Sequence, residues 1–114
     1  MLRWIVLLGL LIVGPLKAQP LAFKGVGLNV AYKEVLALPF SESAKQLAYG
    51  EDPLQYGLLY TADKSDADML VLIHGGCWLN AFDIAHTRPL ASALQQDGFH
   101  VWSIEYRRTG DQGG

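Results

Sequence analysis

The 114-residue chain has little cysteine and no excess of positive charge. Its single cysteine, Cys77, cannot form an internal disulfide, so the fold has to rely on its hydrophobic core. Nine Lys and Arg residues against eleven Asp and Glu give a formal net charge of −2, which is not the basic surface that binds nucleic acid. The three histidines lack metal-ligand spacing, and we expect neither a metal nor a cofactor.

The sequence also lacks an apolar run of the roughly 20 residues that span a bilayer. A shorter apolar run, residues 4–13, follows Arg3 and precedes the small residue Ala18. This layout is typical of a secretory signal, although Leu16 and Lys17 make an imperfect cleavage site. We therefore predict a signal peptide over residues 1–18, export to the periplasm or the outside of the cell, and membrane association through the leader alone. An uncleaved anchor and a buried N-terminal helix are the alternatives.

Residues 19–44 are a mixed lead-in that we expect to be extended or loosely helical. They contain Gly25-Val26-Gly27, which resembles half of a glycine-rich nucleotide loop. No third glycine and no helix pattern follow, so we interpret this segment as flexible backbone.

Residues 45–114 show the patterns of regular structure. Segments 45–49 and 55–60 are predicted strands, and the short turn between them favours an antiparallel hairpin. The continuous apolar run 69–73 is typical of a strand covered on both faces, as in the parallel part of an α/β sheet.

A predicted helix over residues 86–97 follows that strand. Thr87 is its expected N-cap, Pro89 fits its first turn and Gly98 ends it in a left-handed conformation. A further strand is predicted over 99–105. A strand, a helix and a second strand form a crossover unit, so the two strands should be parallel.

The candidate chemistry lies directly after the 69–73 strand, in His74-Gly75-Gly76-Cys77-Trp78. In open α/β sheets, ligands bind beyond the carboxyl ends of the strands. Two successive glycines let the backbone turn sharply and present amide N–H groups to a cleft. Acyl transfer needs such donors, because the carbonyl oxygen becomes an anion in the transition state.

On its Leu-Val-Leu-Ile strand, this motif resembles the His-Gly-Gly oxyanion motif of α/β-hydrolase esterases and lipases. The tryptophan after it makes it most similar to the kynurenine-formamidase and small-carboxylesterase branch. The later segment Ile104-Glu105-Tyr106-Arg107-Arg108 is similar to the Tyr-Arg segment with which the next strand commonly ends in that family. The resemblance covers residues 45–114 and implies the N-terminal portion of an α/β-hydrolase sheet.

The resemblance also implies roles for single residues. The backbone N–H groups of Gly76 and Cys77 would be the oxyanion donors, with the Cys77 thiol not a nucleophile. His74 would support the loop, since this family places its general base near the C-terminus. Substrate contacts are implied for Trp78, Tyr106 and Arg107; a core position for the tryptophan and a structural role for the arginine are the alternatives.

The other two histidines have simpler interpretations. We expect His86 on a solvated helix face, with a place at the mouth of the cleft as the alternative. His100 lies alone on a strand and is expected to be structural.

The family's nucleophile sits on Gly-x-Ser-x-Gly, and this pattern is absent from the sequence. We therefore expect a fragment: the N-terminal part of a serine hydrolase for a small carboxylic ester or amide, inactive by itself. A truncated, non-catalytic remnant that acts as a binding or interaction domain is the alternative. A nucleotide-binding α/β module that uses Gly75 and Gly76 is a third interpretation.

Overall fold

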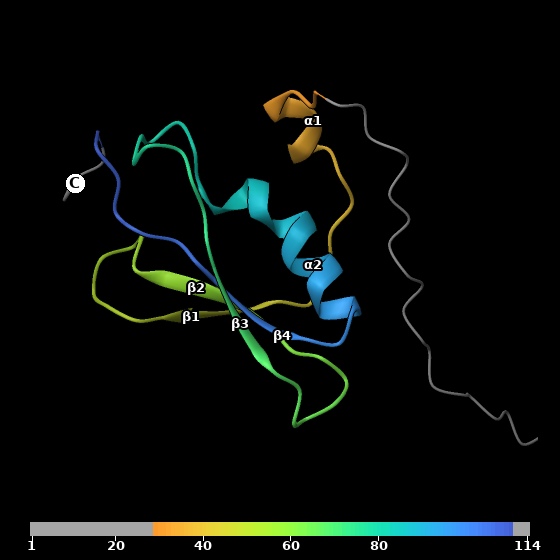
Figure 1. Ribbon diagram of the computed structural model, residues 1–114. Coiled ribbons are helices and arrows are strands. Elements are labelled where there is room, and N and C mark those ends of the chain that lie inside the picture. Colours follow the sequence, from red (N-terminus) through yellow and green to blue (C-terminus); the bar gives the residue numbers. More distant parts are fainter. Residues whose placement is uncertain (1–28, 111–114) are drawn as a thin grey trace, which may run out of the picture.

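The computed structural model describes residues 29–110 (Figure 1). Within them, no helix is long and apolar enough to cross a membrane. The predicted leader over 1–18 and the segment Gly25-Val26-Gly27 lie outside the described residues. The elements are, in order, α1 (Tyr32–Leu36), β1 (Lys45–Ala48), β2 (Tyr56–Tyr60), β3 (Met69–Ile73), the 3₁₀ turn η1 (Ile84–Thr87), α2 (Arg88–Gln96) and β4 (His100–Ile104).

The four strands form one mixed sheet in the order β1-β2-β4-β3. Strands β1 and β2 are antiparallel, which confirms the predicted hairpin. Strand β4 then inserts between β2 and β3, antiparallel to the first and parallel to the second. The parallel β3–β4 pair on either side of α2 confirms the predicted crossover unit, and the chain is of the α/β class.

The core lies between α2 and one face of the sheet. The side chains of Leu58 and Tyr60 alternate with outward-facing neighbours along β2, and Val101 lies opposite Tyr60 on β4. Ala91 of α2 and Ile84 of η1 complete this buried cluster. A single crossover helix thus covers the sheet from one side.

The helix begins later than predicted. Instead of a helix over 86–97, η1 covers Ile84–Thr87 and α2 starts at Arg88. Thr87 precedes α2, but its side chain caps nothing; its hydroxyl donates to the carbonyl of Ile84 and contacts the Ser103 hydroxyl. The predicted side-chain cap was wrong: Thr87 is buried, and its hydroxyl is bonded to these two oxygens instead. Pro89 in the first turn and the left-handed Gly98 are as predicted.

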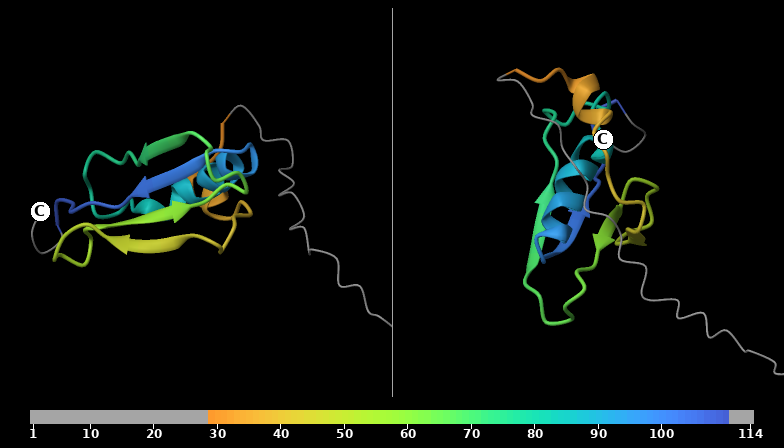
Figure 2. Two further views of the ribbon diagram at one scale, coloured as in Figure 1. Left: turned by 90° about the horizontal axis from the view of Figure 1, so that it is seen from below. Right: turned by 90° about the vertical axis from the view of Figure 1, so that its right-hand side faces the viewer.

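The prediction that residues 69–73 are covered on both faces was wrong for the described part of the chain. Met69, Val71 and Ile73 are 52%, 60% and 65% exposed. β3 is an edge strand, and α2 lies on the opposite face of the sheet (Figure 2). An apolar run alone does not distinguish an edge strand from a central one.

Candidate functional site

The His74–Trp78 motif forms the start of the loop between β3 and η1. Its backbone makes an unusual turn: Gly76, Cys77 and Trp78 have φ angles of 124°, 54° and 58°. The left-handed region is unfavourable for residues with a Cβ atom and costs about 1–3 kcal/mol for each such residue. Gly76 is required for a second reason, because a Cβ atom there would lie 2.5 Å from Cβ of Phe82.

The turn leaves two backbone donors unused. Among the described residues, no hydrogen bond uses the amide N–H of Gly76 or Cys77. The carbonyl of Gly76, in contrast, accepts from Leu79 N at 3.0 Å, which closes the turn. Two adjacent unpaired N–H groups in a tight turn are the arrangement that binds an anionic oxygen.

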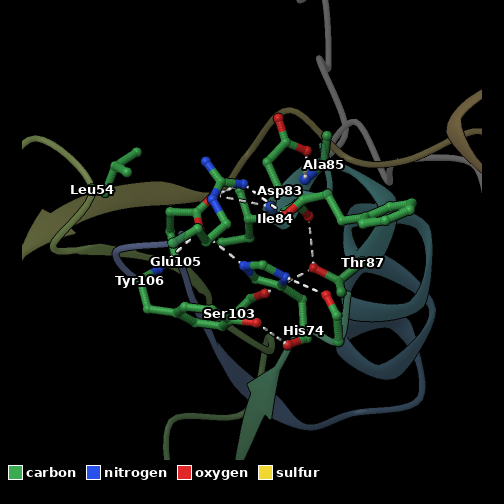
Figure 3. A network of polar contacts seen from close by, with 12 residues as sticks. Leu54, His74, Asp83, Ile84, Ala85, Thr87, Ser103, Glu105 and Tyr106 are labelled. Carbon is green, nitrogen blue, oxygen red and sulfur yellow. Dashed lines mark hydrogen bonds and ion pairs between the residues drawn. The ribbon is translucent and has the colours of Figure 1, made fainter. Parts of the chain in front are cut away.

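His74 anchors the start of this loop. Its side chain is fully buried, and Nε2 donates to Oε1 of Glu105 at 2.8 Å (Figure 3). Its Nδ1 lies 2.9 Å from the carbonyl oxygen of Gly75. The ring is thus held at both nitrogens.

Glu105 is the centre of the network. It directly follows β4, it is 1% exposed, and its two carboxylate oxygens have separate partners. Oε1 accepts from His74 and from the amide of Tyr106 at 2.8 Å. Oε2 accepts from the amide of Ile84 at 3.0 Å and lies 3.5 Å from the guanidinium of Arg108. A buried carboxylate needs such compensation, because an unpaired one would cost several kcal/mol, about 3–5 in comparable ion pairs.

Tyr106 fixes the first residue of the loop from the other side. Its ring stacks on the imidazole of His74, with centroids 4.2 Å apart and planes 9° from parallel. Its hydroxyl donates to the carbonyl of His74 at 2.7 Å. Burial, followed by the charge of Glu105, raises the pKa of this hydroxyl above its ordinary value, so it keeps the proton that it donates.

The middle and the end of the loop are held by residues that follow Glu105. Thr109 donates its amide to the carbonyl of Trp78 at 2.7 Å and accepts from the amide of Asn80 at 3.3 Å. Arg108 donates to the carbonyl of Phe82 at 2.7 Å. Residues 105–109 therefore run alongside the loop and bond to it at its start, middle and end.

His86 does not lie on a solvated helix face, so that expectation was wrong. It belongs to η1 and is half-buried, with its ring 5.6 Å from that of His74 and 5.5 Å from that of Tyr32. Its Nδ1 is buried and has no partner among residues 29–110. The shift from helix to 3₁₀ turn directs this side chain toward the loop. His100 is structural, because its Nδ1 accepts from the amide of Ala62 at 3.0 Å.

The other predicted site residues, two in the motif and one after β4, are open to solvent. Trp78 is 69% exposed, which excludes a core position, and Cys77 and Arg107 are exposed as well. The arginine that holds the neighbouring loop is Arg108, which the sequence analysis did not single out. No local pattern distinguishes Arg108 from Arg107; its burial and its contact with Glu105 exist only in the fold.

The arrangement offers donors for an oxyanion but holds no complete catalytic set. Within the described segment, no three His, Cys, Asp or Glu side chains are grouped as metal ligands would be. Ser103 is 1% exposed, and its hydroxyl is bonded to that of Thr87. No family model matches the chain, and no curated protein and no solved structure is similar to it.

Proposed function

We propose that this chain supplies the oxyanion-hole part of a serine hydrolase that cleaves a small carboxylic ester or amide, with the nucleophile outside these 114 residues. The observation that carries the proposal is the left-handed turn after β3, with the unshared N–H groups of Gly76 and Cys77. The loop between such a strand and the following helix is where α/β-hydrolases carry one side of their oxyanion hole.

In this reaction, the oxygen of a serine forms a bond to the substrate's carbonyl carbon while the general base takes up the serine's proton, and the π electrons move onto the carbonyl oxygen. The N–H groups of Gly76 and Cys77 would donate to that oxygen as its charge develops. One such donor lowers the barrier by about 3–4 kcal/mol. Collapse of the intermediate restores the carbonyl and expels the alcohol or amine, which takes up the proton from the general base. Water then attacks the acyl-serine in the same way, which releases the carboxylic acid and returns the proton to the serine. The base and its acidic partner would also lie outside this chain.

The contacts of His74 agree with this division of roles. A general base needs a ring nitrogen that can reach the serine hydroxyl. Both nitrogens of His74 are bonded, to Gly75 and Glu105, and its side chain is fully buried. We therefore assign His74 to loop support.

The substrate would approach from the open side of the turn. Trp78 is exposed next to the two donors and is the strongest candidate for a substrate contact. Arg107 is exposed beyond the end of β4. The Tyr106 hydroxyl is already bonded to the carbonyl of His74, which leaves its ring edge rather than its hydroxyl for contact. The proposal places the enzyme outside the cytoplasm, in keeping with the predicted leader.

The test starts from the DNA. The reading frame is sequenced beyond codon 114, and the protein encoded by the complete frame is assayed with p-nitrophenyl acetate. We expect a Gly-x-Ser-x-Gly segment, hydrolysis, and loss of hydrolysis when that serine is changed to alanine. The 114-residue protein alone should be inactive.

Two outcomes would contradict the proposal: a frame without the serine motif, or hydrolysis that survives the serine change. A cooperative thermal melt of the 114-residue protein together with a stop codon after Gly114 would instead favour a binding domain without catalysis.

A further inference from the structure

The loop that bears the two free donors has few bonds of its own. Between His74 and Ile84, the backbone bonds within the loop are those from Leu79 to Gly76 and from Phe82 to Leu79. The side chains of Cys77 and Trp78 are exposed. A turn with two unfavourable φ angles persists only when its surroundings hold it in place.

The surroundings that hold it are concentrated on Glu105. One carboxylate oxygen binds the side chain of His74, at the start of the loop, and the other binds the amide of Ile84, at its end. The same carboxylate lies 3.5 Å from Arg108, which bonds to the carbonyl of Phe82. One buried side chain therefore fixes the distance between the two ends of the loop (Figure 3).

We propose that Glu105 is a positioning residue: it keeps the Gly76 and Cys77 donors in place for the transition state by fastening both ends of their loop. This inference rests on the proposed function. Glu105 is 1% exposed, so it acts through His74 and Ile84 and does not touch the substrate.

The variant that tests this is Glu105→Gln, which keeps the size of the side chain and removes one acceptor. A glutamine places an NH₂ group where one carboxylate oxygen stood, and that group faces a backbone N–H donor, either the amide of Tyr106 or the amide of Ile84. One end of the loop is then released. The matched control is Glu51→Gln, the same change at an exposed position in the turn between β1 and β2.

The first readout is hydrogen exchange in the protein from the complete reading frame. We expect the amides of Leu79 and Asn80 to exchange at least about tenfold faster in Glu105→Gln, as for the loss of one net hydrogen bond. The amides of β2 should exchange as in the unchanged protein, because their bonds to β1 and β4 do not involve the loop. Glu51→Gln should change neither set.

The second readout is the kinetics of p-nitrophenyl acetate hydrolysis. We expect Glu105→Gln to lower kcat by about ten- to a hundredfold with KM nearly unchanged, because oxyanion donors act in the transition state. If Glu105→Gln does not fold, Glu105→Asp replaces it: the charge stays, but the shorter side chain cannot reach both ends of the loop. Smaller changes of the same kind are then expected.

Two results would overturn the inference. Loop amides that stay as protected as before would show that Glu105 does not hold the turn, and equal acceleration in the loop and β2 would show a merely structural role. Exchange does not depend on catalysis, so the two proposals can fail separately. A loosened loop in a protein without hydrolase activity would refute the proposed function and leave the fastening of the loop intact.

Discussion

The imidazole of His74 and the phenol ring of Tyr106 lie face to face, with centroids 4.2 Å apart and planes 9° from parallel. The Tyr106 hydroxyl also donates to the backbone carbonyl of His74. The two residues are 32 positions apart in the sequence and follow the adjacent parallel strands β3 and β4. The pair thereby joins the start of the donor-bearing loop to the end of β4, and it yields a first prediction.

Tyr106→Phe should lower the free energy of unfolding by about 0.5–1.5 kcal/mol, the net worth of one hydrogen bond, while the stacked ring remains. Tyr106→Leu should cost more, because it also removes the aromatic contact. Urea denaturation followed by circular dichroism measures both. Equal losses in the two variants would mean that the stacking contributes nothing to stability.

The neighbouring glycines of the motif provide a matched pair. Gly76→Ala should destabilise the protein by about 1–3 kcal/mol, because alanine is strained at a φ of 124° and its Cβ would meet Phe82. Gly75→Ala meets no atom within 4 Å and has no positive φ, so its effect should stay below about 1 kcal/mol. Thermal melts of the two variants, side by side, measure the difference. If Gly75→Ala proved the more harmful, the turn geometry described here would be wrong.

The same valine-to-threonine change, made once on each face of the sheet, compares the burial of the two faces. Val101 is fully buried under α2, whereas Val71, on the adjacent strand, is 60% exposed. Val101→Thr should cost about 1–3 kcal/mol, since it buries a hydroxyl in the core. Val71→Thr should change stability by less than about 0.5 kcal/mol and reduce self-association through the exposed edge. Chemical denaturation and analytical ultracentrifugation would check the two parts; equal losses of stability would contradict the open face.

Stability should fall at alkaline pH. Burial, as the largest cause, raises the pKa of Tyr60 and of Tyr56 above the ordinary value. The folded state therefore holds these protons more tightly than the unfolded state, in which tyrosines titrate at about pH 10, as in peptides. Their contribution is complete below that pH and is lost as the pH rises through the folded-state pKa values. Unfolding in urea at pH 8 and at higher pH should show the decline.

The matched variant for this prediction is Tyr60→Phe. Without the titrating hydroxyl of Tyr60, the decline above pH 10 should be shallower. A pH profile with the same slope in Tyr60→Phe would show that this residue does not take part.

The sequence by itself determined the four strands, the β1–β2 hairpin and the parallel direction of β3 and β4. Alternating apolar residues and a short turn specified the β1–β2 hairpin. The strand–helix–strand order required β3 and β4 to be parallel, because the crossover helix runs back against both strands and the chain therefore reverses its direction twice between them. It also located the Gly75-Gly76 turn after β3, since two glycines directly after an apolar strand mark a sharp change of direction. These features depend on residues that are close in the chain.

The tertiary structure decided which side chains hold that turn. Glu105 and Arg108 are separated from His74 by more than 30 residues, and no local pattern tells whether a carboxylate past a strand will be buried or solvated. The insertion of β4 beside β3 brings them together. The same long-range packing explains three further differences from the prediction: Thr87 bonds to Ser103 instead of capping α2, His86 lies beside His74, and one face of β3 is exposed. Burial depends on which strands and helices become neighbours, and the sequence of one element does not specify this.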